Sequence, residues 1–145
     1  MSHRFPLDLA AIFMFTGALF HIACLFGGAD WLLFAGAPVE FSESYRRGDI
    51  MPIVWTLFIA FVLCVWGFYA LAGARRIRKL PLMKTALLGI AALMLIRGAV
   101  GIVMLFAVNW PWHTSMGQFH AAASVMIFGV GLFYAYGFYA NLKAR

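Results

Sequence analysis

The feature that most constrains this chain is a long apolar run, residues 82–108, which carries one arginine, Arg97, near its middle. About 20 apolar residues in an α-helix, rising about 1.5 Å each, span the hydrocarbon core of a bilayer. The run therefore predicts a membrane-spanning helix. A guanidinium at that depth is costly unless a partner, water or a protein-lined cavity surrounds it, so the sequence also predicts a polar site at Arg97.

The composition indicates the same class of protein. Of the 145 residues, 65% are hydrophobic and 11% are charged, whereas about a quarter of the residues in a soluble domain are charged. We expect one transmembrane domain over residues 1–145. Cys24 and Cys64 fall in apolar runs at different depths, which favours two small core residues over a disulfide.

The expected fold is all-α, an up-down-up-down bundle of four antiparallel transmembrane helices. The apolar runs that predict these helices cover residues 7–26, 50–71, 82–108 and 119–142. Two short matches, residues 4–7 with 79–82 and residues 67–70 with 137–140, predict a repeated hairpin.

The longest connection, residues 27–49, is predicted to be an outer loop. Residues 29–38 are apolar but too short to span a bilayer, so we expect an interfacial or re-entrant segment anchored by Trp31. Residues 39–49 are polar and are expected to form one or two helical turns that end at Gly48.

The last connection, residues 109–118, is predicted to be a short aromatic turn. Pro111 and Gly117 are interpreted as the residues that keep it from being helical.

The basic residues predict the orientation in the membrane, because cytoplasmic loops carry an excess of lysine and arginine. One side holds Arg4, Arg75, Arg76, Arg78, Lys79, Lys84, Lys143 and Arg145. The other side holds only Arg46 and Arg47, among four acidic residues. We therefore expect a multi-pass protein of a bacterial inner membrane with both termini in the cytoplasm. The net charge of +6 follows this topology, so no nucleic-acid partner is expected.

The candidate site lies toward the outer side of the bundle. At about 1.5 Å per residue, His21 and Arg97 lie at nearly the same depth, and His120 opens the last helix close to that level. No acidic residue lies in the core of a span, so the expected partner of Arg97 is an acidic residue of the outer loop, a helix carbonyl, neutral His21 or a bound anion. The predicted ligand-binding residues of this outward-facing pocket are Arg97, His21, Glu43, Asp49, His120, Ser124 and Trp55.

Structural roles remain open for the same residues. Arg97 is also explained as a staple whose stem reaches the outer loop, and His21 as a hydrogen-bond partner of a neighbouring helix. The motifs of zinc proteases, paired cysteines and phosphate loops are absent, so we predict no catalytic residue, metal ligand or cofactor. A b-type haem held by His21 and His120 is the third-ranked interpretation, since their unequal depths strain ligation of one iron.

The chain resembles small four-span bacterial inner-membrane proteins of unassigned function. The resemblance rests on residues 17–21, 27–28 and 34–38, Trp31, Pro52, residues 66–71 and 80–82, and Arg97-Gly98. It implies a four-span inner-membrane protein and carries over no catalytic residue.

We expect a binding or accessory protein rather than an enzyme, whose pocket around Arg97 takes a small anion, a lipid head group or a partner's carboxylate. The alternative is a small transporter or enzyme that uses the same pocket, with Glu43 or Asp49 as proton carrier. A quinone-linked or haem-linked redox protein comes third. The lipid bilayer is the expected partner, with a homo-oligomer or a larger membrane complex left open.

Overall fold

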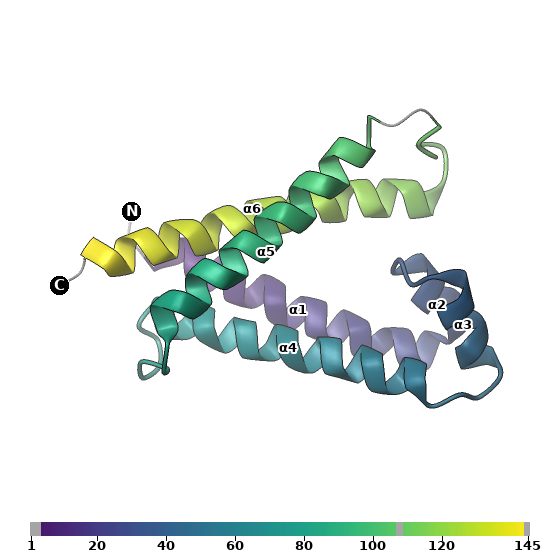
Figure 1. Cartoon of the computed structure of the whole chain (residues 1–145), viewed down its shortest axis with the longest axis horizontal. Coiled ribbons are helices and arrows are strands. Elements are labelled where there is room, and N and C mark those ends of the chain that lie inside the picture. The colour runs from purple at the N-terminus through teal and green to yellow at the C-terminus, as the bar shows by residue number, and fades with distance from the viewer. Residues whose placement is uncertain (1–3, 107–108, 144–145) are drawn as a thin grey trace. The chain divides into compact units, whose positions relative to one another are not determined.

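The computed structural model describes residues 4–106 and 109–143, which form helices and turns without a strand. Its helices are α1 (Phe5–Gly27), α2 (Ala29–Phe34), α3 (Val39–Arg46), α4 (Met51–Gly73), α5 (Met83–Met104) and α6 (Ser115–Lys143) (Figure 1). Four of them, α1, α4, α5 and α6, are long and apolar enough to cross a membrane. The prediction of an all-α protein with four spanning helices is therefore confirmed.

Two boundaries of the long helices differ by four residues from the expected ones, and the others differ by one or two. α6 begins at Ser115 rather than at residue 119, because Thr114 caps it: Thr114 Oγ1 accepts a hydrogen bond from the Gly117 backbone N–H at 3.0 Å. α5 ends at Met104, short of residue 108. Residues 107–108, and Arg145 of the predicted basic tail, lie outside the described residues.

The chain packs as two compact units. Unit 1 comprises Met1–Phe13 and Trp66–Arg145, and unit 2 comprises Met14–Val65. The helices α1 and α4 contribute to both units, whereas α5 and α6 belong wholly to unit 1.

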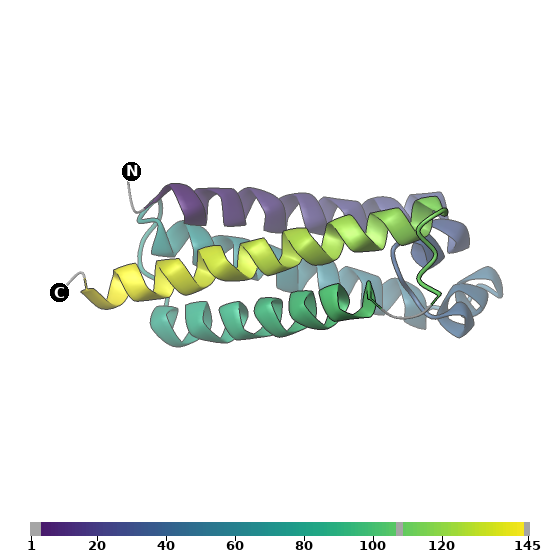
Figure 2. The ribbon, with the colours of Figure 1, turned by 90° about the horizontal axis from the view of Figure 1, so that it is seen from above.

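In unit 1, α5 and α6 lie side by side and antiparallel (Figures 1 and 2). Small residues allow this close approach. A β-carbon built at Gly98 would lie 2.6 Å from the backbone nitrogen of Phe128, and one built at Gly131 would lie 2.9 Å from the backbone nitrogen of Leu95. In a bilayer, helices associate through such close packing, since lipid tails remove the hydrophobic drive between them.

At the end of unit 1 where α1 begins and α4 ends, segments of all four long helices come together. Leu7 of α1 is fully buried, and its side chain fills the space beside Gly73 of α4 and Gly137 of α6. Tyr134 of α6 donates a hydrogen bond from its hydroxyl to the carbonyl oxygen of Trp66 in α4, at 2.7 Å. This convergence fits a four-helix bundle.

The same end carries an ion pair between the start of α1 and the turn after α4. Arg76 donates from Nε to Asp8 Oδ1 at 3.0 Å and from Nη2 to Asp8 Oδ2 at 2.7 Å. This bidentate geometry is the one that a guanidinium and a carboxylate prefer. We call residues 74–82, which connect α4 to α5, the basic turn.

In unit 2, the predicted outer loop is folded into two short helices, α2 and α3, which pack against each other. The polar part forms α3 and is followed by Gly48 at a φ of 83°, as expected for a chain reversal there. The apolar segment, expected to be interfacial or re-entrant, forms α2, and the Trp31 ring packs directly over Gly27 at the end of α1.

Candidate functional site

Arg97 lies closer to one end of its helix than the sequence indicated. The residue is about two turns, or about 10 Å, before Met104, the last residue of α5. Its side chain is exposed at the edge of the contact between α5 and α6, next to the buried Gly98. From this depth the long arginine side chain can extend toward the membrane surface.

Gly101 and Ser124 shape the surroundings of the guanidinium. Arg97 Nη1 lies 3.4 Å from the point that a β-carbon at Gly101 would occupy, and Ser124 Oγ lies 2.2 Å from that same point. Because Gly101 has no side chain, the guanidinium of α5 and the hydroxyl of α6 border one small space. The structure therefore places Arg97 and Ser124 close together.

Ser124 is held in place by its own helix. It is buried, with 5% of its surface exposed, and its hydroxyl donates to the backbone carbonyl of His120 at 2.8 Å. The lone pairs of that oxygen remain available as acceptors. The His120 ring is half-buried and meets the ring of Phe119 edge-on, with ring centroids 5.7 Å apart.

The guanidinium of Arg97 has no protein counter-ion in the described structure. Over residues 4–106 and 109–143 it forms no hydrogen bond or ion pair. Asp8 is the one acidic residue of unit 1, and it is bound to Arg76 of the basic turn. The N–H donors of Arg97 are thus left for water, lipid or a ligand.

His21, in unit 2, hydrogen-bonds within its own helix. Its ring nitrogen Nδ1 lies 2.8 Å from the carbonyl oxygen of Gly17, one turn earlier. The bond to a neighbouring helix that we considered for His21 is therefore not the one that the structure shows. No group of three or more His, Cys, Asp or Glu that could hold a metal occurs among the residues described.

Asp49, also in unit 2, already has local partners. Its Oδ2 accepts a hydrogen bond from the Ser44 hydroxyl at 2.6 Å and one from Arg47 Nη2 at 3.3 Å. The Ser44 hydrogen bond, with the Arg47 charge, holds the pKa of Asp49 below its ordinary value. A carboxyl that stays ionised is a poor proton carrier near neutral pH, which weighs against that role for Asp49.

The other predicted site residues of unit 2 are exposed in the structure. Glu43 is exposed on α3. Trp55 is half-exposed on α4, and its ring meets that of Phe58 edge-on, with centroids 5.8 Å apart. The predicted pocket would join these residues of unit 2 with Arg97, His120 and Ser124 of unit 1, and it stays a prediction.

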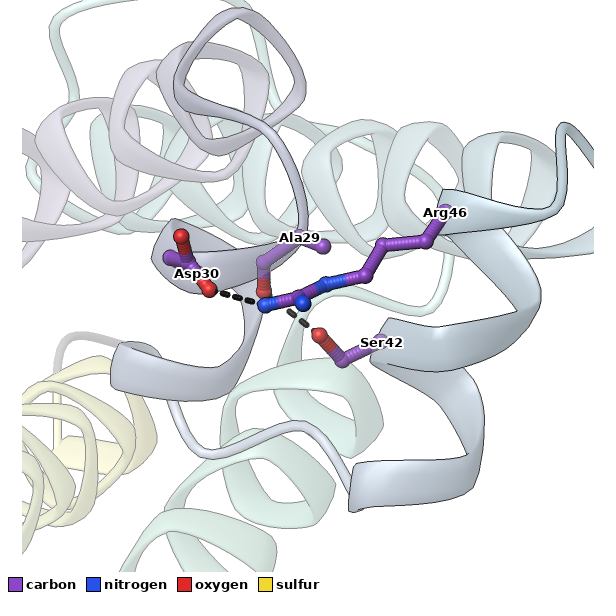
Figure 3. Close-up of polar contacts among 4 residues, drawn as sticks. All are labelled: Ala29, Asp30, Ser42 and Arg46. Atoms are coloured by element: carbon purple, nitrogen blue, oxygen red, sulfur yellow. Dashed lines mark hydrogen bonds and ion pairs between the residues drawn. The ribbon is translucent and has the colours of Figure 1, made fainter.

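The contacts within the connection between α1 and α4, which we call the 28–49 loop, were not predicted from the sequence. Ser42 Oγ donates to the carbonyl oxygen of Ala29 at 2.7 Å, and Arg46 pairs with Asp30 (Figure 3). The hydroxyl of Tyr45 donates to the carbonyl oxygen of Leu25 near the end of α1, at 2.7 Å. The available signal was the spacing of Ser42 and Tyr45, which puts both hydroxyls on one face of a short helix.

No protein family, curated protein or solved structure matches this chain. The chemistry of the site is therefore read from its residues alone: a guanidinium without a carboxylate partner, beside a buried hydroxyl, near the end of a spanning helix.

Proposed function

We propose that this protein is a small multi-pass protein of the bacterial inner membrane, of the four-span kind it resembles, which binds an oxyanion at Arg97. The observation that carries the proposal is the guanidinium beside Ser124, which has no partner among the described residues. Burying a charge in the bilayer costs free energy, so a functional role is the default hypothesis for an intramembrane ionisable residue. The protein would act as a binding or accessory component.

A phosphate group is the ligand that this chemistry favours. The planar fork of a guanidinium matches two oxygens of a phosphate at once, which an ammonium cannot do. The position of Arg97 near the end of α5 suits a group presented at the membrane surface. A phospholipid head group and free inorganic phosphate share this chemistry, and the experiment below separates them.

We test binding with the purified protein in a maltoside detergent, which has no phosphate of its own. Inorganic phosphate and a short-chain phosphatidylcholine are titrated separately by calorimetry. We expect saturable binding of at least one of them, abolished in Arg97→Leu and poorly restored in Arg97→Lys. The leucine variant should be as stable as the wild type or more so, because the desolvation cost of the charge disappears with it.

The control is Arg78→Gln, a cation of the basic turn, which should keep this binding. Saturation by inorganic phosphate alone identifies a free anion as the ligand, and saturation by the phospholipid alone identifies a head group. The proposal is wrong if neither probe binds, or if Arg97→Leu binds as the wild type does. It is also wrong if Arg97→Leu unfolds the protein and Glu43→Gln rescues it, since Arg97 would then stabilise the fold by pairing with the outer loop.

The orientation is proposed on the distribution of charge. We infer that both termini and the basic turn face the cytoplasm and that the 28–49 loop faces outward, because the basic residues gather at the former. Single cysteines at Ile77 and at Glu40, in a chain without Cys24 and Cys64, should react with an impermeant maleimide only at Glu40 in intact cells. Labelling at Ile77 before lysis would reverse the model.

A further inference from the structure

A second charged feature of unit 1 lies at the opposite end from the Arg97 site. Four cations there are exposed and form no ion pair with any described residue: Arg75, Arg78, Lys79 and Lys84. We call these residues the basic surface. They lie in the basic turn and the first turn of α5, within a short stretch of chain.

No described carboxylate of unit 1 neutralises this surface. The one acidic residue of unit 1 is Asp8, and both of its carboxylate oxygens are taken by Arg76. Four of the five acidic residues of the chain lie between residues 30 and 49, in unit 2. Within unit 1 the positive charge of the basic surface is therefore not neutralised by a carboxylate.

Hydrogen bonds hold the surface in a defined place. The hydroxyl of Tyr69 donates to the carbonyl oxygen of Pro81 at 3.2 Å, which ties the end of the basic turn to α4. Asn141 of α6 donates from Nδ2 to the carbonyl oxygen of Gly73, at the start of the turn, at 3.1 Å. The cations are thus presented beside the ends of three spanning helices rather than on a free tail.

Exposed apolar side chains alternate with these cations. Leu82 is 79% exposed, Ile77 is 40% exposed, and Phe5 at the start of α1 is 52% exposed. A surface with cations among apolar groups, at the ends of spanning helices, suits the boundary between head groups and acyl chains. A nucleic acid could also bind these cations through its phosphates, but it offers no apolar phase for the exposed side chains of Leu82, Ile77 and Phe5. A lipid offers both an anionic head group and acyl chains.

We propose that the basic surface binds the head groups of anionic phospholipids in the adjacent leaflet. Clusters of lysine and arginine next to a spanning helix attract anionic lipids, each cation contributing about fivefold in binding. The lipid is recognised by its net negative charge, so zwitterionic phosphatidylcholine should be excluded in competition. This site is independent of the oxyanion site at Arg97.

The test uses the full chain in nanodiscs made of equal parts phosphatidylcholine and phosphatidylglycerol. Native mass spectrometry after release from the disc counts the lipids that remain bound. We expect the wild type to retain phosphatidylglycerol in preference to phosphatidylcholine, with the preference falling as salt rises. The double variant Arg78→Gln/Lys79→Gln should lose about twenty-five-fold of that preference.

The matched control exchanges the same two residues, Arg78→Lys with Lys79→Arg, and should keep the preference because the charge is unchanged. The variant Arg97→Leu should keep it as well, so this result and the binding at Arg97 can fail separately. The proposal is overturned if the wild type retains the two lipids in equal amounts. It is overturned too if the neutral double variant stays folded and keeps the preference, or if the exchange variant loses it.

Discussion

An alanine at Gly98 is expected to separate α5 from α6 and to lower the free energy of unfolding by about 1–3 kcal/mol or more. The added β-carbon would lie 2.6 Å from the backbone nitrogen of Phe128 and 2.7 Å from its α-carbon. Backbone atoms cannot rotate away as the end of a flexible side chain can. α5 and α6 would have to move apart, and the close packing that holds them together in a bilayer would be lost.

The measurement is the unfolding free energy from titration with sodium dodecyl sulphate, followed by circular dichroism. Gly89 on the same helix is the matched control, since a β-carbon there meets nothing within 4 Å. Gly89→Ala should therefore leave the stability unchanged or raise it slightly, because alanine is the better helix former. Equal effects of the two alanines would refute the close contact at Gly98.

Leu7→Ala is expected to cost about 2–5 kcal/mol, the usual range for removing a fully buried leucine. Leu7 has no exposed surface, and its side chain is the atom group nearest to both Gly73 and Gly137. Its loss would leave a cavity where three helices meet, bordered by glycines that have no side chain to fill it. The same denaturant titration measures the loss.

The control for this prediction is Leu9→Ala, one of the exposed positions of α1, with 37% of the Leu9 surface accessible. It removes the same atoms from the same helix and should cost much less. A larger loss of stability at Leu9 than at Leu7 would show that Leu7 does not fill the contact between α1, α4 and α6.

The spanning helices could be predicted because the bilayer leaves the chain little choice. A backbone that crosses hydrocarbon must satisfy its own hydrogen bonds, so an apolar run of sufficient length becomes a helix. Their ends were predicted less well, because ends depend on single polar contacts. Thr114 shows this: its hydroxyl starts α6 within a stretch that Pro111 and Gly117 seemed to exclude from helix.

The closeness of Arg97 to Ser124 across two helices could be predicted in part. Helical spacing placed Gly101 one turn after Arg97 on α5 and put Ser124 and Gly131, with His120, on one stripe of α6. In the structure Gly101 faces Ser124 of α6, and Gly131 faces Leu95 of α5. The partners of Asp49 and His21 could not be predicted this way. Each is satisfied by a neighbour within its own segment, Ser44 and Gly17, and such local bonds depend on rotamers that a residue pattern does not specify.

The ion pair between Asp8 and Arg76 also has a consequence for the order of assembly during synthesis. The two residues are 68 positions apart, so a ribosome working at about 5–20 residues per second makes the carboxylate several seconds before its partner. Until then the first turn of α1 lacks this ion pair, although the end of α1 can already accept the hydrogen bond from Tyr45. The ion pair can form once the basic turn has been made. The hydrogen bonds that Tyr134 and Asn141 of α6 donate to α4 form last. A ribosome stalled before residue 76 should therefore leave α1 inserted but not yet docked at its first turn.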